Sequence, residues 1–127
     1  MAVPPRQPWD ERDLNGGDWR YDFAARTATF GWGDTAFLTL GCAGPGSIML
    51  TAGLGTGDRP QRVDLSTSFG VDALAMTSDS MAFAADDPRL DRIAFSRGRF
   101  ALDAANGSSL TIPVHAEIGR VIEDCRG

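Results

Sequence analysis

A chain of 127 residues, 43% of them hydrophobic, is long enough to bury one core but not two. Its net charge of −5 argues against nonspecific binding to nucleic acid or to an anionic membrane. No apolar stretch approaches the length of a membrane span. The 12 basic residues are all arginine and the acidic residues are mostly aspartate, which favours sheets and turns over exposed helices, although genomic base composition explains the arginine preference equally well.

Residues 1–17 are predicted to form a tether, and residues 18–127 a single β-rich domain. The tether begins with several prolines and ends in Asn15-Gly16-Gly17, a turn sequence. Proline-rich linkers of this kind commonly follow a removed signal peptide or a lipid-attachment site. We therefore expect a leader or a lipid anchor upstream of Met1.

Short segments in which apolar and polar residues alternate follow one another from residue 18 onward, as expected of an antiparallel sheet protein. These segments lie at residues 18–23, 27–30, 35–42, 48–52, 63–69, 71–76 and 80–85. The clearest is residues 63–69, where Val63, Leu65, Thr67 and Phe69 share one face. The glycine-rich residues 53–60 are expected to form a flexible loop.

The last third of the chain predicts two helices around a hairpin. Asp87-Pro88 supplies an N-cap and a proline for a short helix that ends near Phe95, and Asn106-Gly107 is a hairpin turn signal. Pro113 then leads a second helix with one apolar stripe, formed by Val114, Ile118, Val121, Ile122 and Cys125. The whole pattern predicts an antiparallel β-sandwich or partly closed barrel of about seven to nine short strands, with two short helices near the C-terminus.

The two cysteines, Cys42 and Cys125, are both expected to face the core. Strand periodicity places Cys42 on the same face as Leu38 and Leu40, and helix periodicity places Cys125 on the apolar stripe. In an exported protein this pair would oxidise, and the disulfide would close a loop of about 80 residues and stabilise the fold by roughly 4 kcal/mol. The alternative is two reduced, buried thiols in a cytosolic protein.

Several short sequences occur together in this chain. They are Gly17-Asp18-Trp19-Arg20-Tyr21, Leu40-Gly41-Cys42, Phe95-Ser96-Arg97-Gly98-Arg99-Phe100, Ile112-Pro113 with Glu117, and Val121-Ile122-Glu123-Asp124-Cys125-Arg126. Together they resemble small proteins of alphaproteobacterial, especially sphingomonad, genomes. That resemblance implies a signal or lipoprotein leader and a periplasmic or envelope location, and it implies no activity. A fainter likeness to invasion-associated locus B proteins rests on the small β domain with its late helix, and the additional cysteines of that family are missing.

Three features that could indicate chemistry have simpler structural explanations. The Gly-x-Gly-x-Gly sequence at residues 53–57 lacks the spacing and the lysine of a phosphate-binding loop. His115 is the only histidine and is expected at a helix start, in a capping role. Asp86, Asp87 and Asp91 do not have the spacing of a calcium loop. We therefore predict no catalytic residue, no metal site and no cofactor.

Two features are candidates for binding a partner. Arg89, Arg92, Arg97 and Arg99 form either a patch that grips carboxylate or phosphate groups, or a solvated face neutralised by nearby aspartates. Trp32, between two glycines in a predicted turn, is either an interface anchor or part of the core.

These features favour a noncatalytic envelope protein that binds an unknown protein or an anionic surface polymer, without nucleic acid as a partner. One alternative is a small envelope hydrolase or isomerase whose site is assembled across strands, with His115, Asp86 and Asp87 as its only candidate residues. Another is a structural accessory subunit of an envelope assembly.

Overall fold

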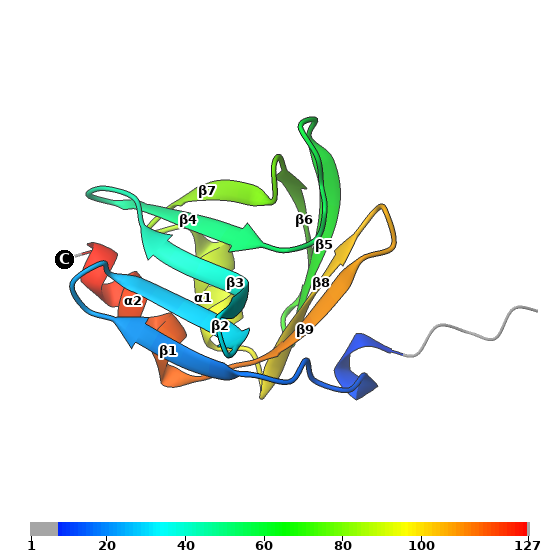
Figure 1. Ribbon diagram of the computed structural model, residues 1–127, viewed down its shortest axis with the longest axis horizontal. Helices are drawn as coiled ribbons and strands as arrows, with labels where there is room; N and C mark the ends of the chain where they lie inside the picture. Colours follow the sequence, from blue (N-terminus) through cyan, green and yellow to red (C-terminus); the bar gives the residue numbers. More distant parts are fainter. Residues whose placement is uncertain (1–7, 127) are drawn as a thin grey trace, which may run out of the picture.

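The computed structural model describes residues 8–126, in which nine strands form two antiparallel sheets (Figure 1). The strands are β1 (Asp18–Asp22), β2 (Thr27–Trp32), β3 (Thr35–Cys42), β4 (Ser47–Ala52), β5 (Gln61–Thr67), β6 (Gly70–Met76), β7 (Ser80–Ala84), β8 (Arg99–Ala104) and β9 (Ser109–Pro113). The helices are the 3-10 turn η1 (Trp9–Glu11), α1 (Pro88–Ala94) and α2 (Ala116–Arg126).

The predicted mainly β fold with two antiparallel sheets is confirmed, and the sandwich describes it better than a closed barrel. One sheet has the strand order β1-β2-β3-β4-β7, and the other has the order β6-β5-β8-β9. Every neighbouring pair is antiparallel, because short turns connect most of them. Alternate residues of both sheets form one buried core, which includes Phe30, Leu40, Leu65 and Phe100.

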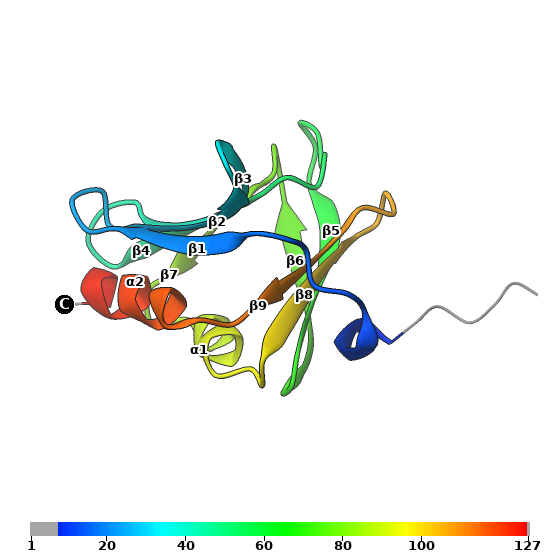
Figure 2. The same ribbon diagram turned by 60° about the horizontal axis from the view of Figure 1, so that its bottom comes forward.

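Helix α2 closes the core against the five-stranded sheet, and α1 packs beside it (Figure 2). The buried residues of α2 are Ile118, Val121, Ile122 and Cys125, all on the predicted stripe. The helix begins at Ala116, later than predicted, because Pro113 ends β9 opposite Arg99. Only α2 is near the C-terminus, since the β8–β9 hairpin follows α1.

A disulfide joins Cys42 at the end of β3 to Cys125 in α2, as predicted. The two Cα atoms are 5.5 Å apart, and the bond closes 83 residues of chain. Because β3 is the central strand of its sheet, the bond fixes the end of α2 to the middle of the sheet. The described residues include no free cysteine.

The described part of the predicted tether, residues 8–17, contacts the four-stranded sheet. Arg12 forms a bidentate ion pair with Asp103 of β8, at 2.7 and 2.8 Å. The backbone and side chain of Asn15 both bond to the backbone of Thr111 in β9. Ala101 of β8 and Thr111 face away from the core yet are buried (0% and 3% exposed), since this segment lies over them. Ordered contacts therefore begin before Asp18, the residue at which the sequence pattern predicted the domain to start.

None of the helices in the described part of the chain is long and apolar enough to cross a membrane.

Candidate functional site

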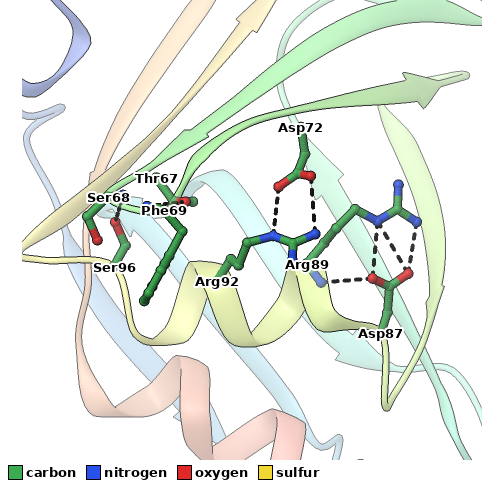
Figure 3. A network of polar contacts seen from close by, with 8 residues as sticks. All are labelled: Thr67, Ser68, Phe69, Asp72, Asp87, Arg89, Arg92 and Ser96. Carbon is green, nitrogen blue, oxygen red and sulfur yellow. Dashed lines mark hydrogen bonds and ion pairs between the residues drawn. The ribbon is translucent and has the colours of Figure 1, made fainter.

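Two of the four arginines named from the sequence hold α1 in place (Figure 3). Asp87 caps α1 by accepting the backbone N–H of Arg89, and the Arg89 guanidinium pairs with the same carboxylate at 2.8 Å. This hydrogen bond from Arg89 lowers the pKa of Asp87, and Asp87 in turn raises the pKa of Arg89. Arg92 pairs with Asp72 at 3.0 Å, which joins α1 to β6. Both arginines therefore stabilise the fold.

The other two arginines differ from each other. The Arg99 guanidinium donates a hydrogen bond to the backbone carbonyl of Arg12 at 2.6 Å, so it helps to hold the N-terminal segment on β8. Arg97 is exposed, and within residues 8–126 no hydrogen bond or ion pair engages its guanidinium group. The four arginines therefore do not form a single anion-binding patch, and Arg97 alone is available to a partner.

The turn between β5 and β6 is fixed to the end of α1 by two serines. The Ser68 N–H donates to Ser96 Oγ, and Ser68 Oγ accepts the N–H of Arg97, both at 3.0 Å. Ser96 is 5% exposed, and its hydroxyl donates to the carbonyl of Arg99 at 2.6 Å. The Phe69 N–H donates to Thr67 Oγ1 at 3.2 Å. Hydrogen bonds therefore connect this turn to the residues that follow α1.

These contacts hold two phenylalanines in solvent. Phe69 is 61% exposed and directly follows Ser68. Phe95 is 71% exposed and directly precedes Ser96. In Figure 3 the Phe69 ring extends from the turn toward α1. We refer to Phe69, Phe95 and Arg97 as the Phe69–Phe95 surface.

The sequence pattern placed Phe69 in the strand at residues 63–69, whereas the observed strand ends at Thr67, two residues earlier. The alternation of residues 63–69 continues one step too far, because β5 ends at Thr67 and Phe69 lies in the turn. Gly70, with a φ of 134°, was the signal that the strand had already ended. Phe95 was expected at the end of the helix, where it is found, but its exposure was not predicted.

Trp32 is 68% exposed, so the interpretation of this residue as part of the core is wrong. It lies at the end of β2, after a bulge in which Phe37 of β3 has no partner on β2. The bulge also leaves Ala36 exposed, although strict alternation along residues 35–42 places it on the same face as Leu38 and Leu40. In Figure 2 the end of β2, where Trp32 lies, is on the other side of the fold from α1. Trp32 is therefore not part of the Phe69–Phe95 surface, which lies at the end of α1.

The glycine-rich loop, His115 and the aspartates, for which the sequence analysis gave structural explanations, lie in separate parts of the fold. The loop at residues 53–60 buries Leu54 and Thr56, and Thr56 exchanges hydrogen bonds with Asp79, which connects the loop to the turn between β6 and β7. His115 is exposed before α2, and its carbonyl accepts the N–H of Ile118. Asp91 pairs with Arg126 at 2.9 Å.

The described residues contain no group of three or more His, Cys, Asp or Glu side chains arranged to hold a metal ion. An open pocket of about 500 Å³ borders the disulfide. Its lining combines both cysteines with the guanidinium-bearing residues Arg26 and Arg126. Arg126 is already bonded to the carbonyl of Ala85 and to Asp91, so its donors are largely occupied.

Comparison with known protein families, curated proteins and solved structures finds no match to this chain.

Proposed function

We propose that this chain is a noncatalytic binding protein of the periplasm or cell envelope, and that it binds a partner protein through the Phe69–Phe95 surface. The single observation that carries this proposal is the exposure of Phe69 on a turn that hydrogen bonds connect to Ser96 and Arg97 at the end of α1. An exposed phenylalanine contributes little to the stability of the fold, whereas an interface that covers it buries its apolar area.

The chemistry of this surface fits a protein interface. Aromatic and arginine side chains are enriched at the centres of such interfaces, where they contribute most of the binding energy. The backbone of Phe69 is hydrogen-bonded to Thr67 Oγ1 within the turn, so ordering of the backbone adds little to the entropy cost of binding. Arg97 next to these rings adds a charged donor for an acidic group on the partner.

The disulfide supports the location. Disulfides persist mainly in oxidising compartments, and Cys42–Cys125 connects two core elements rather than an exposed, exchangeable pair of loops. A periplasmic or envelope location, with or without a lipid anchor, accounts for a permanent bond of this kind.

The test uses a matched pair of phenylalanines. Phe95 and Phe23 are each 71% exposed, but Phe23 lies in the β1–β2 turn, outside the Phe69–Phe95 surface. A photo-crosslinking amino acid replaces either residue, and cells carrying each variant are irradiated. We expect a discrete crosslinked product from position 95 and none from position 23. Equal labelling at both positions, or labelling at neither, would contradict the proposal.

A structural accessory subunit of an envelope assembly is the second candidate, and the same exposed rings favour it. The two roles differ in persistence, because an accessory subunit stays in a complex through purification from native membranes. Size-exclusion chromatography of the extracted native protein separates them. A binding protein elutes at its own mass, and an accessory subunit elutes with its assembly.

A further inference from the structure

The outer face of the five-stranded sheet is free of charge over four of its strands. None of the residues in β2, β3, β4 or β7 is charged, although charged residues make up 23% of the chain. Their inward residues form the core, and their outward residues are at least partly exposed and, apart from Met49, mostly small or hydroxyl-bearing. The central ones are Thr27, Thr29, Thr39, Gly41, Met49, Thr51, Ser80 and Ala82. Both helices lie on the opposite side of this sheet (Figure 2).

The strand register arranges four hydroxyl groups in one straight row on this face, with Arg20 of β1 at its end. Each member lies directly opposite the next across a strand pair, and the row runs across all five strands. Its members are Arg20, Thr29, Thr39, Thr51 and Ser80. Neighbouring strands are about 4.8 Å apart, so the hydroxyls repeat at about that interval. The hydroxyls of Thr51 and Ser80 are 3.1 Å apart and share a hydrogen bond.

At its β1 end the row enters a shallow pocket of about 290 Å³. The lining residues are Arg20, Tyr21, Asp22, Thr27 and Thr29. Arg20 and Asp22 are both exposed, and they place a charged donor and a charged acceptor beside two hydroxyls. A pocket with donors and acceptors of both kinds fits a ligand rich in hydroxyl groups.

We propose that this face binds an uncharged polysaccharide, with one sugar unit in the Arg20–Asp22 pocket and the chain extended along the hydroxyl row. A neutral polymer matches β2, β3, β4 and β7, because binding along these four strands removes no charged group from water, and only Arg20 and Asp22 of β1 contact it as charged groups. Each threonine hydroxyl both donates and accepts, as sugar hydroxyls do. The interval between strands is comparable to the length of one sugar unit, so successive units meet successive hydroxyls. This face is distinct from the Phe69–Phe95 surface, and the proposal does not depend on a protein partner.

The test measures retention of the purified protein on insoluble neutral polysaccharides: a β-glucan, an α-glucan and a mannan, with the polyanion alginate as a contrast. The variant carries Thr39→Val and Thr51→Val, which remove two hydroxyls but keep the branched shape that suits a strand. Thr35→Val, in β3 but outside the row, is the matched control. We expect retention on a neutral polymer, and a dissociation constant about tenfold higher for the double variant than for the control.

Phe95→Ala separates this proposal from the preceding one, because it is expected to leave polysaccharide retention unchanged. Circular dichroism of the double variant confirms that it remains folded. Retention on none of the neutral polymers overturns the proposal, and so does equal retention of the double variant and the native chain. Retention on alginate alone also overturns it, because that result assigns binding to arginine side chains.

Discussion

Replacing Cys42 and Cys125 together with alanine removes the only covalent link between β3 and α2 in the described chain. The bond spans 83 residues of sequence. In the chain-entropy relation, a loop of that length lowers the entropy of the unfolded state enough to stabilise the fold by about 4.5 kcal/mol at 25 °C. Domains of this size have a total unfolding free energy of about 5–15 kcal/mol, so the loss is a large fraction of the whole.

Urea unfolding followed by tryptophan fluorescence measures this loss, with the buried Trp19 (7% exposed) as a reporter of core opening. Three samples are compared: the oxidised native chain, the native chain under reductant, and the double alanine variant. We expect the last two to agree and to lie about 4 kcal/mol below the first. Intact masses after alkylation, with and without prior reduction, confirm the state of each sample. A variant within about 1 kcal/mol of the oxidised chain would refute the entropic argument.

Three further predictions concern the polar contacts. Arg12→Ala leaves the largely buried carboxylate of Asp103 without its partner, so we expect a loss of about 1–3 kcal/mol in urea unfolding, and no loss would contradict the contact. Ser96→Ala removes the acceptor of the Ser68 N–H, and amide hydrogen exchange at Ser68 is expected to accelerate while exchange in β3 stays unchanged. Asp87→Asn keeps the cap but removes the charge. The pKa of Asp87 is lowered in the fold, so its ionised carboxylate stabilises the folded state above the ordinary aspartate pKa. That stabilisation is lost as pH falls through the lowered pKa. Stability of the variant is therefore expected to fall less steeply with acidification than that of the native chain, and parallel pH curves would contradict this.

The order of elements could be predicted from the sequence because each strand carries its own period-two pattern. Residues 35–42, for example, alternate on their own, and β3 has the predicted bounds. The disulfide followed from two local patterns that placed Cys42 and Cys125 on inward faces. Both predictions needed only the immediate neighbours of each residue.

The features that the sequence analysis missed depend on contacts between residues that are distant in the sequence. Arg12 and Asp103 are separated by 91 residues, and no local pattern of the chain indicates that they meet. The Phe69–Phe95 surface likewise requires the contact between Ser68 and Ser96, 28 residues apart. The arginines were identified as candidates because they lie close together in the sequence, but the tertiary fold determines their partners and therefore which of them are free.

The Cys42–Cys125 bond also sets a limit on how far this domain can be stretched. A pull on the N-terminal end first loads the Arg12–Asp103 bridge and the Asn15–Thr111 contacts, and then peels away β1, an edge strand. Extension continues through β2 and β3 until it reaches Cys42, where the covalent loop stops it. Strands β4 to β9 and both α-helices lie inside that loop, so a mechanical load is carried by the sulfur–sulfur bond and bypasses them. The two surfaces proposed for binding would therefore respond differently to such a load. The hydroxyl row loses three of its five strands, β1, β2 and β3. Phe69 and Phe95 lie between the two cysteines, in the part of the chain that the disulfide protects from extension.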